Sequence, residues 1–65
     1  MEVKLRTALR YQRESAGKLQ KDAADVIGVT PSQYGKIERG QLRLMLDDAI
    51  KLARWLGCRV EDLAD

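Results

Sequence analysis

The segment 20–40, QKDAADVIGVTPSQYGKIERG, constrains the fold of this chain more than any other part of the sequence. Its first half has apolar residues at helical spacing and stops at Gly28, a residue type that closes helices because it enters the left-handed conformation at little steric cost. Thr30 then offers a side-chain oxygen to the free amides of a second helix, and Pro31 suits its first position, where no backbone donor is missed. We therefore expect two short helices joined by a tight turn, a helix-turn-helix.

Apolar residues also recur at helical spacing in the rest of the chain. Helices are expected at about 3–16, 20–27, 31–39, 46–56 and 60–64. Sixty-five residues allow one domain with a small core. The sequence therefore predicts an all-α fold in which residues 1–65 form a single domain, with the helix-turn-helix at about 20–40.

The composition is that of a soluble helical domain, with 45% hydrophobic and 34% charged residues. No apolar run approaches the roughly 20 residues that span a membrane, and no secretory signal is visible. Cys58 has no second cysteine with which to form an internal disulfide, so a reducing cytoplasm is the simpler setting. We expect a cytoplasmic protein that does not associate with membranes.

Several chemistries lack the residues that they need. The chain has no histidine and one cysteine, which excludes the common zinc sites and a Ser-His-Asp arrangement. It has no phosphate-binding glycine loop, and the adjacent Asp47 and Asp48 point to different sides of a helix. We therefore expect neither enzyme activity nor a cofactor. The net charge of +2 is mild, so the positions of the basic residues matter more than their number.

The segment 20–40 also resembles the signature of the phage repressor and Cro-like (XRE) family. It contains Q-x-x-x-A-x-x-x-G-V followed by I-E-R-G, which is a fairly specific pattern. Further matches outside the segment are Leu9, Arg13, Gly17, Ala53, Leu56, Gly57, Glu61 and Leu63. The resemblance implies a compact five-helix, lambda-repressor-like domain that inserts the second helix of the motif into the major groove of double-stranded DNA.

In that arrangement the outward side of helix 31–39 would read the bases. Ser32 and Lys36 are four residues apart, opposite the inward-facing Tyr34 and Ile37. Lysine can donate to guanine, glutamine can pair with adenine, and serine can serve either. Gly35 adds no side chain, which permits close approach but costs the helix up to about 1 kcal/mol. The expected base-contacting residues are Pro31, Ser32, Gln33 and Lys36. Without the resemblance, an ordinary polar face would be the simpler interpretation.

Other polar residues would contact the DNA backbone. Gln20 begins a helix whose amides and dipole favour a phosphate, and Arg43 lies in a loop that crosses the backbone in relatives, within reach of the minor groove. The expected backbone-contacting residues are Lys18, Gln20, Thr30, Arg39, Gln41 and Arg43. Lys4 and Arg6 are interpreted as part of a solvated basic face.

Two further expectations concern the start and end of the helix-turn-helix. The resemblance implies an ion pair between Arg13 and Glu38, whose role is geometric because burial of a pair costs desolvation. Where relatives have a polar cap before Gln20, this chain has Leu19, which cannot accept from the helix amides. Either Leu19 packs inward, or the helix begins without a conventional cap; Lys18 would then be free to reach a phosphate.

The C-terminal part of the chain is expected to hold the dimer interface. Surface near the last two helices often forms a symmetric dimer in the family, and Trp55 and Arg59 are the expected contacts, with burial in the core as the alternative for Trp55. Cys58 is expected to be a buried, small apolar residue. The segment 42–46, LRLML, is unusually apolar. Part of it must pack on the core, and any part left exposed would form a surface for a partner. Leu46 also begins the apolar side of helix 46–56, so it is expected to face the core.

The leading functional hypothesis is a sequence-specific, double-stranded-DNA-binding transcriptional regulator, a repressor that binds an inverted repeat as a homodimer. Three alternatives stay open. The protein could be a small activator that touches RNA polymerase, as restriction-modification controller proteins of this family do. It could be an antitoxin of the same fold, or a module that binds another protein instead of DNA.

Overall fold

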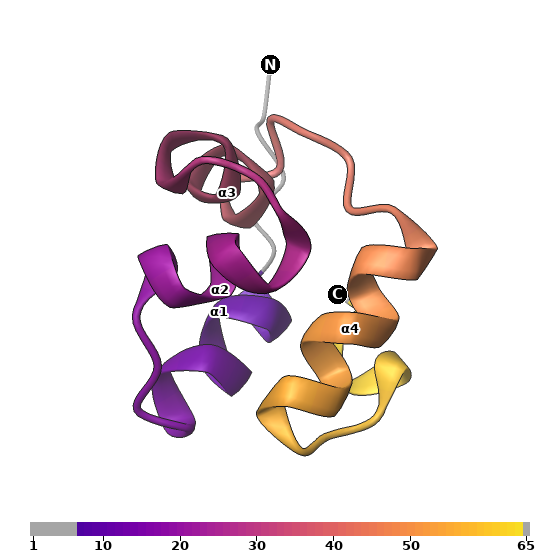
Figure 1. Ribbon diagram of the computed structural model, residues 1–65. Helices are drawn as coiled ribbons and strands as arrows, with labels where there is room; N and C mark the ends of the chain where they lie inside the picture. Colours follow the sequence, from indigo (N-terminus) through magenta and orange to yellow (C-terminus); the bar gives the residue numbers. More distant parts are fainter. Residues whose placement is uncertain (1–6, 65) are drawn as a thin grey trace.

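The computed structural model describes residues 7–64, and the predictions for Lys4, Arg6 and the start of the first helix lie outside them. The described residues form four α-helices and one short 3-10 helix, with no strand (Figure 1). The elements are α1 (Thr7–Ser15), α2 (Gln20–Ile27), α3 (Pro31–Glu38), α4 (Leu46–Leu56) and η1 (Val60–Leu63). The all-α prediction is confirmed. The last of the five predicted helices is a single 3-10 turn, because four residues are too few for a regular α-helix.

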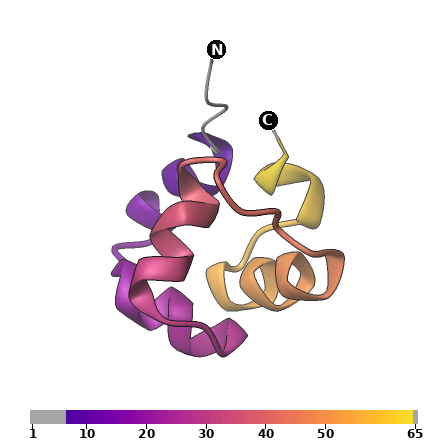
Figure 2. The same ribbon diagram turned by 90° about the horizontal axis from the view of Figure 1, so that it is seen from above.

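The helices enclose one small core. Its largest fully buried side chains are Leu9, Tyr34 and Leu52, which come from α1, α3 and α4. Ala23 and Ala24 of α2 are also fully buried, and these small side chains let α2 pack closely against both α3 and α4. η1 contacts α1 and α4 and so closes the other end of the core (Figures 1 and 2). None of the helices among residues 7–64 is long and apolar enough to cross a membrane.

The turn between α2 and α3 forms as the sequence predicts. Gly28 ends α2 in the left-handed conformation, with φ 72° and ψ 33°. The Thr30 side chain accepts a hydrogen bond from the backbone N–H of Gln33, and Pro31 occupies the first turn of α3. At the start of α2, Leu19 has extended backbone angles, makes no side-chain capping bond and is 58% exposed. Of the two arrangements open for Leu19, the structure therefore has the uncapped helix start.

The connector between α3 and α4 leaves apolar side chains in solvent. Leu44 packs against the core, whereas Leu42, Met45 and Leu46 are 41%, 56% and 67% exposed. The expectation that Leu46 faces the core is wrong, because Leu46 begins α4 at the rim of the domain and the buried side of the helix starts only at Ala49. Cys58 is half-buried in the turn after α4 and is therefore more accessible than predicted.

Candidate nucleic-acid interface

The outward side of α3 carries the four side chains predicted to read bases. Pro31, Ser32, Gln33 and Lys36 are all exposed. Tyr34, Ile37 and Glu38 are buried, and they fix the rotation of the helix about its axis. Ser32 and Lys36 thus project from a helix that the core holds in one orientation. Gly35, expected beside them on the open side, is buried.

Gln33 has a second function that the residue pattern indicates but the prediction missed. Its side-chain oxygen accepts from the backbone N–H of Thr30 at 3.0 Å, while Thr30 Oγ1 accepts from the backbone N–H of Gln33 at 3.1 Å. This reciprocal pair is a capping box, and the T-x-x-Q spacing could have identified it. The Gln33 oxygen and the Thr30 hydroxyl therefore hold the start of α3, which leaves the amide nitrogen of Gln33 for a DNA contact.

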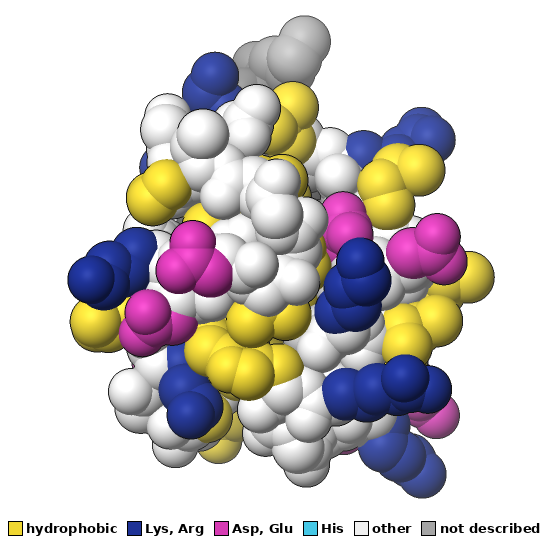
Figure 3. All heavy atoms as spheres, in the orientation of Figure 1, with side chains coloured by type: hydrophobic (Ala, Val, Ile, Leu, Met, Phe, Trp, Pro, Cys, Tyr) yellow, Lys and Arg dark blue, Asp and Glu magenta, His cyan; other side chains and the backbone are white. Residues whose placement is uncertain are grey.

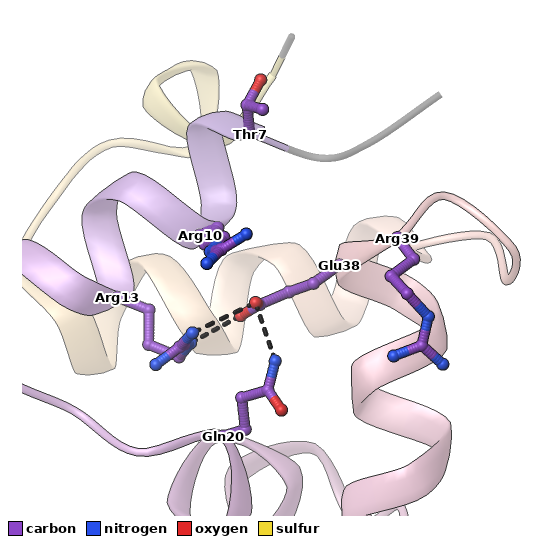
Figure 4. A pocket seen from close by; sticks show the side chains of 6 residues that line it. All are labelled: Thr7, Arg10, Arg13, Gln20, Glu38 and Arg39. Atoms are coloured by element: carbon purple, nitrogen blue, oxygen red, sulfur yellow. Dashed lines mark hydrogen bonds and ion pairs between the residues drawn. The ribbon is translucent and has the colours of Figure 1, made fainter. Parts of the chain in front are cut away.

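The ion pair implied by the family resemblance is present. Arg13 Nε donates to Glu38 Oε2 at 2.6 Å, and Arg13 Nη2 donates to Glu38 Oε1 at 3.2 Å (Figure 4). Gln20 Nε2 donates to the same Glu38 Oε1 at 3.0 Å, and Arg13 Nη1 donates to the Lys18 carbonyl oxygen at 2.8 Å. Both charged side chains are buried. The network joins α1, the start of α2 and the end of α3, so it fixes the recognition helix relative to the rest of the domain.

The network also stabilises the charged forms of its members. Burial alone would raise the pKa of Glu38, but the hydrogen bonds from Arg13 and Gln20, together with the nearby Tyr34 hydroxyl, outweigh it and lower that pKa below the ordinary value. The hydrogen bond to Glu38 raises the pKa of Arg13. Burial, and then the Glu38 carboxylate, raise the pKa of Tyr34 far above the physiological range. The Tyr34 hydroxyl is buried close to this pair and makes no hydrogen bond to any group within residues 7–64.

A basic pocket of about 240 Å³ opens over this network (Figure 4). Its lining residues are Thr7, Arg10, Arg13, Gln20, Glu38 and Arg39. Three arginines and one carboxylate line the pocket, and the Glu14 carboxylate lies beside Arg10 and Arg13. The three positive groups outnumber the two negative ones, which favours a bound anion such as a backbone phosphate. Among residues 7–64, Arg10 pairs with the exposed Glu14, at 3.3 Å. Arg10 is absent from the sequence-predicted contacts, although its position three residues before Arg13 places both on one side of α1.

Lys18 and Trp55 were predicted for different functions, and the structure brings them together. Lys18 Nζ lies 5.5 Å from the centroid of the Trp55 ring, within the range of a cation–π interaction. Trp55 is half-buried and packs against the core. Arg59 is exposed and pairs with Glu61 at 3.8 Å. Gln41 and Arg43 are exposed in the connector after α3, where Gln41 Oε1 accepts from Arg39 Nε at 3.3 Å.

A second hollow, of about 170 Å³, lies between the start of α4 and η1. Its lining residues are Leu44, Leu46, Ala49, Val60, Leu63 and Ala64. We call it the α4–η1 groove. Exposed apolar side chains appear over the first turn of α4, between basic and acidic neighbours (Figure 3). Within residues 7–64 no cluster of side chains suited to a metal ion is found.

Comparisons with known proteins agree with this geometry. A family model described as Helix-turn-helix matches residues 9–63. The structure of the restriction-modification controller protein C.AhdI from Aeromonas hydrophila is 33% identical, with a TM-score of 0.77, over 88% of this chain and 86% of that one. The structure of the clp gene regulator ClgR from C. glutamicum is 26% identical, also with a TM-score of 0.77, over 88% of this chain and 74% of that one. The search of curated proteins returned no match.

Proposed function

The chain belongs to the helix-turn-helix family of DNA-binding regulators, and on this premise we propose that it binds a specific double-stranded DNA sequence as a homodimer and represses transcription. The observation that carries the proposal is the outward side of α3. Ser32 and Lys36 are exposed there, while Tyr34, Ile37 and Glu38 hold the helix from beneath. A rigid, exposed helix of this kind fits the major groove.

In the proposed complex, Lys36 donates to guanine O6 or N7, and Ser32 contacts the neighbouring base. Pro31 and Gln33 approach the bases from the start of α3. The backbone contacts come from Gln20, Thr30, Arg39, Gln41 and Arg43. Lys18 is the weakest of the predicted backbone contacts, because it would have to leave the Trp55 ring to reach a phosphate.

The proposed dimer packs through the α4–η1 groove. Leu46 lines the groove and is 67% exposed, and the neighbouring Met45 is 56% exposed, so exposed apolar side chains and an apolar hollow are adjacent on one surface. A two-fold contact needs such self-complementarity, since each copy must supply both parts. Trp55, predicted at the interface together with Arg59, follows Leu46 by nine residues, about two and a half turns, and so points to the opposite side of α4. Trp55→Ala therefore tests a competing dimer surface.

Repression would follow if the bound dimer covers a promoter. A controller protein of a restriction-modification system is the second candidate, and the 33% identity with C.AhdI favours it. In that case the same DNA contacts would serve activation through RNA polymerase, and the direction of the effect in a reporter assay separates the two. Either function requires DNA access and is consistent with a cytoplasmic location, and neither requires a catalytic group.

The test is binding to the DNA upstream of the protein's own gene, measured by fluorescence anisotropy on duplexes that contain its inverted repeats. We expect affinity to fall steeply as salt rises, because phosphate contacts release counterions. Arg43→Ala should weaken binding to all duplexes about equally, since a phosphate contact carries no base information. An absence of salt-dependent binding, together with retention of a protein partner that Trp55→Ala or Leu46→Lys releases, would instead support a protein-interaction module or an antitoxin.

A further inference from the structure

Gly35 is a glycine whose backbone conformation does not require glycine. It lies inside α3, and the residues with positive φ are Gly17, Gly28, Gly40 and Gly57, not Gly35, within the part of the chain that the structure describes. Glycine is also among the poorest helix formers, and α3 has only eight residues. A reason other than the backbone angles must therefore account for its place in the recognition helix.

The space beside Gly35 is occupied by the side chain of Arg39. A β-carbon built on Gly35 would lie 3.1 Å from Arg39 Nη1 and 3.9 Å from Arg39 Cζ and Nη2, and these guanidinium atoms are its three nearest neighbours outside the helix backbone. The Arg39 side chain runs back along α3 instead of extending away from it (Figure 4). Because Gly35 has no side chain, the guanidinium lies where a β-carbon would crowd it.

The arginine held in this way keeps its phosphate-binding atoms free. Arg39 Nε donates to Gln41 Oε1 at 3.3 Å, which fixes the side chain at a second point. Its two terminal amino groups have no hydrogen-bond partner among residues 7–64. They form a planar fork that matches two phosphate oxygens. Arg39 is also one of the residues that line the basic pocket.

We propose that Gly35 is a positioning residue, which holds the Arg39 guanidinium beside α3 so that its free amino groups meet one phosphate of the bound DNA. This inference rests on the proposed DNA-binding function. An exposed arginine otherwise samples many rotamers and must be ordered on binding, so a guanidinium that is already placed binds at a lower entropic cost. The helix gives up propensity at position 35 in exchange for that placement.

The competing explanation is that Gly35 lets the DNA itself approach α3 closely. The two explanations differ in whether the effect of a side chain at position 35 depends on Arg39. A double-mutant cycle with Gly35→Ala, Gly35→Leu and Arg39→Ala measures that dependence. Thermal unfolding of every variant shows whether it is folded, and both Gly35 substitutions are expected to raise Tm, by roughly 4 °C, because they improve helix propensity.

We expect Gly35→Ala to weaken binding by about threefold at moderate salt, and Gly35→Leu by about tenfold, with the magnitude of the log–log salt slope reduced by about 0.9 for the one phosphate lost. The small step for alanine follows from the 3.1 Å contact, which a shift of the flexible guanidinium partly relieves. In the Arg39→Ala background, the same Gly35 substitutions should change affinity by less than about twofold, because no guanidinium remains to be displaced.

Equal losses from Gly35→Leu with and without Arg39 would overturn the inference in favour of close DNA approach. The inference would also be overturned if Gly35→Leu left the DNA affinity and the salt slope unchanged in the protein that retains Arg39. Failure of the wild-type protein to bind any duplex would remove the proposed function together with the inference, and the wild-type titration, measured first, separates that result from the other two.

Discussion

Two regions of the molecule reverse the usual relation between polarity and burial. Between α1 and the end of α3, the charged side chains of Arg13 and Glu38 are buried and paired with each other. In the connector and the first turn of α4, the apolar side chains of Met45 and Leu46 are in solvent. The buried charges are satisfied within the domain and therefore set its geometry. The exposed apolar groups are not covered within residues 7–64, and in the proposed dimer a second copy covers them.

Removal of Glu38 should have the largest effect. Glu38→Ala leaves Arg13 as an uncompensated buried charge and should lower the free energy of unfolding by about 3–5 kcal/mol. A domain this small has little more than that in total, so the variant should be largely unfolded at 25 °C. Urea titration followed by circular dichroism measures the loss. Glu14→Ala, which removes an exposed carboxylate near the same arginines, is the control and should change the free energy by less than about 0.5 kcal/mol.

The paired replacement Arg13→Met with Glu38→Leu sharpens this result. It removes both charges, so no unpaired charge remains, and its stability should lie within about 1 kcal/mol of the wild type. DNA affinity should still fall, because Gln20 loses its acceptor and the end of α3 loses its link to α1. If Glu38→Ala alone were as stable as the wild type, the buried network would not be what holds α1 and α3 together.

Disruption of the exposed apolar surface should affect association instead of folding. Leu46→Lys places a charge at the proposed interface and should weaken dimerisation by about 2 kcal/mol, roughly 30-fold, with little change in monomer stability. Sedimentation velocity over a concentration series measures the shift. Tyr11→Lys is the matched control, because Tyr11 on α1 has the same 67% exposure and lies outside the α4–η1 groove. An unchanged dimer in Leu46→Lys, with loss of the dimer in Trp55→Ala, would move the interface to the opposite side of α4.

Acid should act on the buried network and leave the apolar surface unaffected. Because the pKa of Glu38 is lowered on folding, the unfolded chain binds a proton more readily than the folded one. Its contribution to stability is complete above the ordinary value of 4.5 and is lost as the pH falls through that value toward the lowered pKa. Urea titrations between pH 7 and pH 3 should show this decline in the wild type and a flatter curve in Glu38→Gln. Parallel curves would contradict the assignment.

The smallest expected effect concerns the two apolar residues that begin helices. Leu19 and Met45 stand at the caps of α2 and α4, and neither side chain makes a capping bond. Leu19→Ser and Met45→Ser should each raise the free energy of unfolding by about 0.5–1 kcal/mol, because serine satisfies an orphan amide. Only Met45→Ser should also weaken the dimer. Equal effects on association would mean that Met45 does not belong to the partner surface.

The sequence allows prediction of the backbone more fully than of the side chains. The bounds of α2 and α4 follow from local features, namely helical spacing and the terminal glycines Gly28 and Gly57. The exposure of Leu19 and Leu46 does not, since the sequence cannot show which positions at a helix end the rest of the domain covers. The T-x-x-Q spacing indicates the capping function of Gln33, whereas the sequence analysis predicts only a base contact for this residue.

The site shows the same division. The exposure of Ser32 and Lys36 follows from helical periodicity, and the Arg13–Glu38 pair follows from the family resemblance. The contact between Lys18 and Trp55 joins residues far apart in the sequence, so no local pattern indicates it. The place of Arg39 beside Gly35 depends on which rotamer the arginine adopts, which spacing alone leaves open.

Discrimination between DNA sequences by α3 tests the central claim most directly. The measurement is the ratio of dissociation constants for a duplex with the inverted repeat and a scrambled duplex of equal length, for the wild type and Lys36→Ala at one salt concentration. We predict that Lys36→Ala reduces the preference for the inverted repeat by about 1–3 kcal/mol, so that the scrambled-duplex dissociation constant divided by the inverted-repeat one falls roughly 5- to 150-fold. Lys51→Ala, at an exposed lysine on α4, should leave this ratio unchanged. A ratio that Lys36→Ala does not change would contradict the claim that this side of α3 reads the bases.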